Sequence, residues 1–199
     1  MSQLPQKPDF AAIEAKAHQT VSRRSLILAL IGNLVYCWSN NESMFIYVLM
    51  LLMNSDEAVA TVVFGTLNTT RARIDLVERL AKLKITDKAL GKALDRLVAR
   101  FNELTKLRNE FNHCLYTVDG TGEITDTQSI KLQEVRGQLQ LTVNRKMDDA
   151  RVNEMLEAIR SLTKLNRDIW DFLPRLKEHL DKSAPRQERA APPAGAAPA

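Results

Sequence analysis

Apolar residues recur every three or four positions along most of the chain, which is the period of a helix with one buried face. The most regular row belongs to a helix that follows Thr86 and Asp87, and its members are Leu90, Leu94, Leu97, Phe101, Leu104, Phe111 and Leu115. A closing helix opens at Asp148 or Asp149, and its inner face is formed by Val152, Met155, Leu156, Ile159, Leu162, Ile169, Trp170, Leu173 and Leu176. The pattern therefore predicts a mainly α protein.

The first half of the chain is the most apolar part. We expect a first helix over Ala12–Trp38 and a second over Met44–Met53, joined by a polar turn at Ser39–Ser43. Each apolar run is too short to span a membrane, so two buried core helices are the better interpretation. A third helix is expected over Asp56–Leu67, with Ser55 as its cap, and a fourth from Thr70.

The period changes after residue 113. Cys114–Val118 is followed by Asp119-Gly120-Thr121-Gly122, a strong turn signal, and then by Glu123–Val135 and Gly137–Val143. The last of these segments alternates apolar and polar residues, as a strand does. The sequence predicts a small antiparallel β insertion over about residues 114–145, covering one end of a helical bundle.

Composition supports one helical domain over residues 13–182, with a flexible arm over 1–12 and a disordered Pro/Ala-rich tail over 183–199. The formal net charge of +4 is compatible with a polyanionic partner and does not demonstrate one. The helix that begins at Thr70 has charged residues on its outer side, which we interpret as a solvated surface rather than an RNA contact. These residues are Arg71, Arg73, Glu78, Arg79, Lys82 and Lys84.

Residues that could form a metal or redox centre are sparse. Cys37 and Cys114 make no disulfide framework or zinc motif, and both fit a reducing compartment. His18 and His179 are expected to be surface histidines. There is no phosphate loop, no HExxH and no dinucleotide fingerprint, so we expect neither a metal nor a cofactor. The N-terminus lacks an apolar signal segment, and a cytoplasmic location is expected.

One position interrupts the regular apolar row. Where the next aliphatic is due, the chain has Arg108, and a buried guanidinium needs a partner or a purpose. Glu110, or Glu42 or Asp75 from another helix, could pair with it and make it structural. Asn109 and His113 are four positions apart, which places them on one adjacent helix face. Alone, a histidine here could simply suit the negative end of the helix dipole.

Arg108, Asn109 and His113 together resemble the RNxxxH signature of HEPN-domain proteins. The layout is similar to bacterial HEPN-like proteins of the abortive-infection type, in which apolar helices precede the motif helix and a short β excursion and a closing helix follow. The resemblance covers about residues 15–180 and implies a HEPN-like up-and-down bundle. Asn112 and Cys114 flank His113 where that group commonly has Ala and Gly.

The resemblance implies a metal-independent endoribonuclease with a composite site at a homodimer interface, acting as a toxin or phage-defence component. His113 would move a proton at the ribose 2′-OH or the 5′-oxygen, Arg108 would hold the scissile phosphate, and Asn109 would orient the imidazole or bind the phosphate. Cleavage would leave a 2′,3′-cyclic phosphate, and an antitoxin or modifying protein is a further implied partner. The alternative is a non-catalytic helical-bundle binding protein with a degenerate motif.

Overall fold

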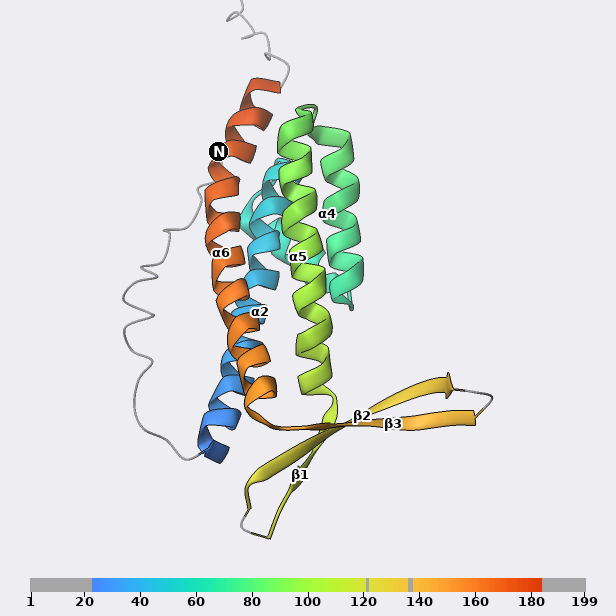
Figure 1. Cartoon of the computed structure of the whole chain (residues 1–199). Helices are drawn as coiled ribbons and strands as arrows, with labels where there is room; N and C mark the ends of the chain where they lie inside the picture. Colours follow the sequence, from blue (N-terminus) through green and yellow to red (C-terminus); the bar gives the residue numbers. More distant parts are fainter. Residues whose placement is uncertain (1–22, 121, 136–137, 184–199) are drawn as a thin grey trace, which may run out of the picture.

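The computed structural model describes residues 23–120, 122–135 and 138–183. The predicted arm, the first part of the predicted first helix and the tail from residue 184 onward lie outside the described residues. Within the described part, helices predominate and one small sheet follows the motif helix, which confirms the mainly α prediction (Figure 1). The elements are α2 (Arg23–Met53), α3 (Glu57–Thr66), α4 (Thr70–Lys84), α5 (Lys88–Asn112), β1 (Cys114–Val118), β2 (Ile124–Val135), β3 (Gln138–Lys146) and α6 (Asp149–Ser183).

Helix α2 is continuous, so the prediction of two helices joined by a turn was wrong. Asn41 is 1% exposed, and its Nδ2 donates to the carbonyl oxygen of Leu162 on α6 at 3.0 Å. Glu42 accepts a hydrogen bond from Thr70 at 2.6 Å and pairs with Arg73 at 3.1 Å, both on α4. Asn41 and Glu42, which resemble part of a turn in the sequence, thus have partners on neighbouring helices, and α2 continues through them.

The apolar second half of α2 lies in the core, where Phe45, Val48 and Leu49 are fully buried. Among the helices described, none alone is long and apolar enough to cross a membrane. Helices α2 and α3 together pass that test of length and composition, with a bend of 118° between them.

Short polar side chains set the starts of the helices. Asp56, rather than the predicted Ser55, caps α3 by accepting from the backbone N–H of Val59 at 2.8 Å. Thr69 caps α4, and Asp87, which directly precedes α5, accepts from two backbone N–H groups in the first turn of that helix. These bonds satisfy amides that have no partner within their own helix.

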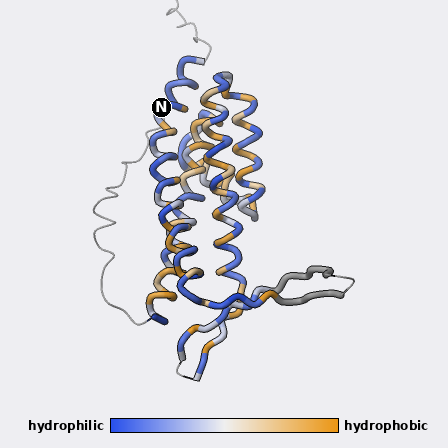
Figure 2. The backbone as a smooth tube through the Cα atoms, in the orientation of Figure 1, coloured by the Kyte–Doolittle hydropathy of each residue, from blue (hydrophilic) through white to orange (hydrophobic). Residues whose placement is uncertain are grey.

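The predicted apolar rows form the core. From the row on α5, the residues that are buried are Leu90, Leu94, Leu97, Phe101 and Phe111. Leu104 is half-buried, and Leu115 is 64% exposed because it lies on β1 rather than on the helix. Figure 2 shows apolar and polar residues alternating along the helices of the bundle, as expected where each helix has one inward face.

The bundle has two levels along its long axis. Successive helices α4, α5 and α6 alternate in direction, and α4 begins about halfway along α5 (Figure 1). The level that contains α4 is the upper level; the lower level contains residues 23–38 of α2, the end of α5 and the start of α6. In the lower level Leu28 and Tyr36 are 52% and 57% exposed. Leu28 and Val35 precede Glu42 by 14 and 7 residues, so they share the face of α2 that α4 covers higher up.

The three strands form an antiparallel sheet of order β1-β2-β3 at the lower end of the bundle, which confirms the predicted meander. Cys114 lies opposite Ser129, and Ser129 lies opposite Val143. The register shifts between Ile130 and Gln133, and the outer part of the β2–β3 hairpin points away from the helices (Figure 1). Because β1 starts one residue after His113, the sheet fixes where α5 ends.

Candidate active site at the end of helix α5

Arg108, Asn109 and His113 lie together in the last two turns of α5. Asn109 and Arg108 belong to the helix, and His113 is its C-cap, with φ −118° and ψ 19°. The backbone N–H of His113 donates to the carbonyl oxygen of Asn109 at 3.0 Å. The helix therefore places all three predicted residues at one end of the bundle.

Arg108 is half-buried, and its guanidinium lies over the ring of Trp38, 3.8 Å from the ring centroid. Trp38 is held in turn by a hydrogen bond from its Nε1 to Thr105 Oγ1 at 2.8 Å and by stacking on Phe101. Arg108 Nη1 donates to Asn109 Oδ1 at 2.8 Å. Its Nε is buried without an acceptor, so part of the guanidinium is desolvated without compensation.

Arg108 pairs with no carboxylate among the described residues. The three acids considered from the sequence pair elsewhere: Glu42 with Arg73, Asp75 with Arg71, and Glu110 with Arg151. Burial lowers the pKa of Arg108, while the charge of Glu42 acts in the opposite direction. The guanidinium of Arg108 is stacked on an indole and has no ion pair among the described residues, so it is chemically able to bind an anion.

The side chains around Arg108 differ in how accessible they are. Asn109, Asn112 and His113 are exposed, and no side chain in the described structure hydrogen-bonds to the imidazole of His113. The Oδ1 of Asn109 is directed to Arg108. Cys114 is half-buried, and its Sγ points back to the carbonyl oxygen of Phe111 at 3.4 Å. The imidazole is thus accessible on the surface of the described structure.

A buried ion pair that the sequence did not reveal fixes this end of α5. Arg151 on α6 is 5% exposed, lies 4.1 Å from the ring centroid of Phe111, and donates to Glu110 at 2.6 Å. Arg151 also pairs with Glu154, and Arg145 on β3 reaches the same Glu110 oxygen at 3.2 Å. No periodicity in the sequence predicts an ion pair between Glu110 and Arg151. The sequence offered one indication, an arginine beside Val152 on the inner face of the closing helix.

Strand β1 is tied to the same end of α5. The Tyr116 hydroxyl donates to the carbonyl oxygen of Phe111 at 2.6 Å. Burial raises the pKa of Tyr116 far above its usual value, with a further contribution from Cys114, so the phenol stays protonated and keeps donating. The position of His113 is therefore set from both sides, by the helix before it and by the strand after it.

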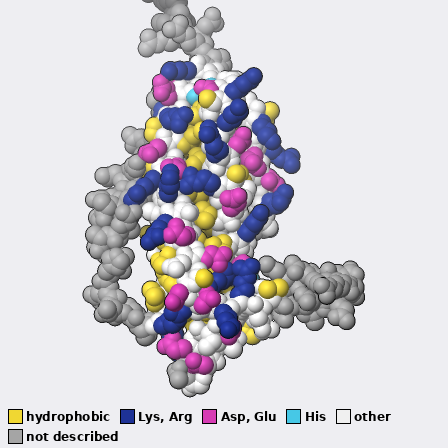
Figure 3. All heavy atoms as spheres, in the orientation of Figure 1, with side chains coloured by type: hydrophobic (Ala, Val, Ile, Leu, Met, Phe, Trp, Pro, Cys, Tyr) yellow, Lys and Arg dark blue, Asp and Glu magenta, His cyan; other side chains and the backbone are white. Residues whose placement is uncertain are grey.

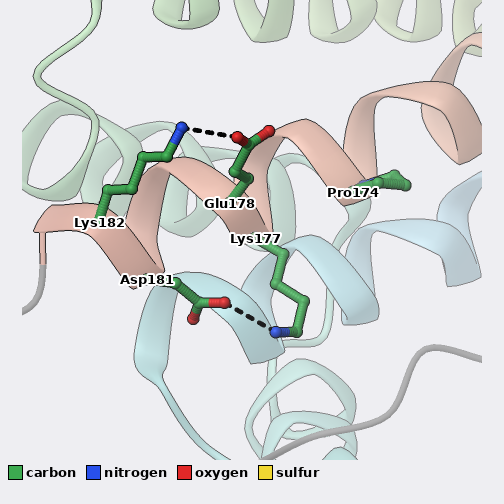
Figure 4. Close-up of a pocket in the computed structure, with 5 residues that line it drawn as sticks. All are labelled: Pro174, Lys177, Glu178, Asp181 and Lys182. Carbon is green, nitrogen blue, oxygen red and sulfur yellow. Dashed lines mark hydrogen bonds and ion pairs between the residues drawn. The ribbon is translucent and has the colours of Figure 1, made fainter.

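Other parts of the described surface offer less chemistry. A shallow pocket on α6, at the opposite end of the bundle, is lined by Pro174, Lys177, Glu178, Asp181 and Lys182 (Figure 4). Its charges pair along the helix, Lys177 with Asp181 and Lys182 with Glu178. His179 was expected to be an unpartnered surface residue, but its Nε2 accepts from the backbone N–H of Thr86 at 3.2 Å. In the described residues no three His, Cys, Asp or Glu side chains gather as metal ligands.

Comparisons with protein-family models, curated proteins and solved structures find no match for this chain.

Proposed function

We propose that this protein is a HEPN-like, metal-independent endoribonuclease whose active site contains Arg108, Asn109 and His113. The observation that carries the proposal is the state of Arg108. It is half-buried, it pairs with no carboxylate among the described residues, and it lies on the same helix end as the exposed His113. A scissile phosphate would supply the anion that this guanidinium lacks.

The chemistry follows from the residue types. His113 takes the proton from a ribose 2′-OH, and the 2′-oxygen attacks the adjacent phosphorus. The bond to the 5′-oxygen breaks, and the leaving oxygen receives a proton. Arg108 stabilises the charge that builds on the phosphate, and Asn109 adds a hydrogen bond to it. The products are a 2′,3′-cyclic phosphate and a free 5′-hydroxyl.

A homodimer completes this site in our proposal. One copy brings one imidazole, whereas the reaction needs a base at the 2′-OH and an acid at the 5′-oxygen. The exposed Leu28 and the half-buried Val35 lie on the side of α2 that contacts α4 in the upper level. In the lower level this apolar side of α2 is less covered and lies beside the end of α5, which supports the binding of a second copy at this place. A cytoplasmic toxin or phage-defence role, with an antitoxin or modifying protein as silencing partner, goes with such an activity.

An assay on a defined RNA tests the proposal, with wild type beside His113→Ala, Arg108→Ala and the matched control His179→Ala at the other end of the bundle. We expect the first two to lose at least about 100-fold in cleavage rate and the control to keep it. A 2′-deoxy nucleotide at the cleavage position should block the reaction, because the attacking oxygen is missing. Cleavage that survives His113→Ala would contradict the proposal.

The second candidate is a non-catalytic binding protein on the same scaffold. It is favoured by one observation: Arg108 and Asn109 are hydrogen-bonded to each other, and Arg108 is stacked on Trp38, so both side chains already have partners within the subunit. Under this alternative the wild type binds a partner and cuts no RNA.

A further inference from the structure

Positive charge is concentrated in one short stretch of the chain. Residues 79–96 contain six Lys or Arg and two Asp, a net charge of +4, which equals the formal net charge of the whole protein. The cations are Arg79, Lys82, Lys84, Lys88, Lys92 and Arg96. Outside this stretch, acidic and basic residues balance.

All six side chains are exposed, and none forms an ion pair with another described residue. They occupy the end of α4 and the start of α5, which lie next to each other at the upper end of the bundle. Figure 3 shows Lys and Arg side chains gathered over these ends. Of the two acids in the stretch, Asp87 is engaged in capping α5 through its carboxylate.

The positions of the cations on α5 are unfavourable for the stability of that helix. Lys88, Lys92 and Arg96 follow one another at i, i+4 and i+8, so like charges are direct neighbours on one face. Lys88 is also the first residue of the helix, where the dipole disfavours a cation. Lys82 and Lys84, by contrast, suit the C-terminal end of α4. Helix stability explains the cations on α4 but not the row on α5.

We propose that Lys88, Lys92 and Arg96, which we term the α5 row, bind the phosphate backbone of single-stranded RNA. This inference rests on the proposed function and adds a substrate-docking surface outside the active site. A helix rise of 1.5 Å per residue spaces the cations about 6 Å apart along a line about 12 Å long, which suits a linear polyanion.

The row suits RNA better than a membrane surface. Its exposed neighbours on α5 are small or acidic, namely Ala89, Asp95 and Ala99, and the apolar face of the helix is buried in the bundle. In the basic stretch the single large apolar side chain that is exposed is Leu83, at the end of α4. A membrane-binding helix needs large apolar residues beside its cations. Arg108 lies 12 residues after Arg96, about 18 Å further along the same helix and a third of a turn around it, so RNA held by the row would extend towards the site.

The experiment measures binding of a fluorescent uridine oligonucleotide in a His113→Ala background, which prevents cleavage. The test variant is Lys88→Gln/Lys92→Gln/Arg96→Gln. The matched control, Lys164→Gln/Lys177→Gln/Lys182→Gln, removes the same charge from α6 residues that have ion-pair partners. We expect the slope of log affinity against log salt to fall by about 2 in the test variant, at roughly 0.7 per phosphate contact, and to change little in the control.

Three results would overturn the inference. Equal losses in both triple variants would mean that net charge alone governs binding. If the parent His113→Ala protein does not bind RNA, the proposed docking surface is contradicted. Tight binding to phosphatidylserine vesicles that the α5-row substitutions abolish, with RNA binding unchanged, would assign the row to a membrane. If RNA binding depends on the row while a protein with His113 intact cuts no RNA, the proposed function fails and the row stands.

Discussion

Two arginines near the end of α5 each stack on an aromatic ring, in opposite electrostatic settings. Arg151 lies over Phe111, with its side chain 4% exposed and ion-paired to Glu110 and Glu154. Arg108 lies over Trp38 without a carboxylate partner among the described residues. The same side chain is therefore an internal anchor at one position and an incompletely satisfied cation at the other.

Replacing each arginine by methionine separates these roles. Arg108→Met should change the free energy of unfolding by no more than about 1 kcal/mol, because the lost stacking is offset by relief of a desolvated Nε. Arg151→Met should cost about 3 kcal/mol, since it leaves Glu110 and Glu154 without their buried partner. Urea denaturation of both variants measures the difference. A loss above about 3 kcal/mol for Arg108→Met would make that residue structural and undermine its proposed role.

The sequence revealed one of these arginines and not the other for a physical reason. Arg108 interrupts a regular apolar row, and that break is visible along the chain. Arg151 pairs with Glu110 across 41 residues, and no local period encodes a contact between different elements. The neighbours of Arg108 were equally hidden: Trp38 was assigned to the end of a helix, with nothing to indicate that its ring would lie beneath the guanidinium.

At the scale of elements, α2 contains one buried amide, that of Asn41. Asn41 donates to the carbonyl oxygens of Cys37 and Leu162, but its Oδ1 is buried without a partner. Both carbonyl oxygens lie in helices, where they already accept backbone hydrogen bonds, so they do not need the side-chain amide of Asn41 as a donor.

Asn41→Leu should therefore leave the free energy of unfolding within about 1 kcal/mol of the wild-type value, on the stabilising side. Asn41→Asp should lower it by at least about 2 kcal/mol at neutral pH, because a carboxylate would face two carbonyl oxygens in the core. Thermal and urea unfolding of both variants provide the check. A large loss in the leucine variant would show that the bond to α6 holds the two helices in register.

The contact between α5 and α6 predicts a dependence on pH. Burial alone would raise the pKa of Asp168, but hydrogen bonds from Arg100 at 2.5 Å and from Lys164 outweigh it and lower the pKa. A lowered folded-state pKa stabilises the fold above the unfolded value of about 3.9, and this contribution is lost as the pH falls through the folded value.

Wild type should lose more stability than Asp168→Asn between about pH 5 and pH 3, because only the wild type gives up this ion pair. The matched variant is Asp95→Asn, an exposed acid on α5 without an ion pair to any described residue. Urea midpoints across this range measure the effect. If wild type and Asp168→Asn fall in parallel, the pair contributes nothing.

Element boundaries were predictable where a turn or cap has a strong local signal. The bounds of β1 and the cap of α5 followed from Gly-containing turn residues and from Asp87. The continuity of α2 was not predictable, because Asn40, Asn41 and Glu42 resemble a turn unless the carbonyls and cations of the neighbouring helices are known.

At the scale of the whole molecule, the proposed RNA-binding row and the proposed cleavage site lie in different levels of the bundle. The upper level is enclosed by α3 and α4 and has the exposed α5 row, whereas the lower level contains Arg108 and His113 at a less covered place (Figure 1). In the proposed order of events, RNA binds first to the α5 row in the upper level and is then cut at His113 in the lower level. Neither level could be seen in the sequence, because the point where α4 begins along α5 depends on how the helices pack.

The greater exposure of the lower half of α2 has a consequence for local opening of the native state. Amide hydrogen exchange should be faster across residues 23–38 than across residues 44–53, because the described residues enclose the first segment less than the second. A second copy bound at the less covered face would slow exchange in the first segment alone, and the protection would rise with protein concentration. Amide hydrogen exchange would thus report whether two copies assemble at the proposed catalytic end before any RNA is added.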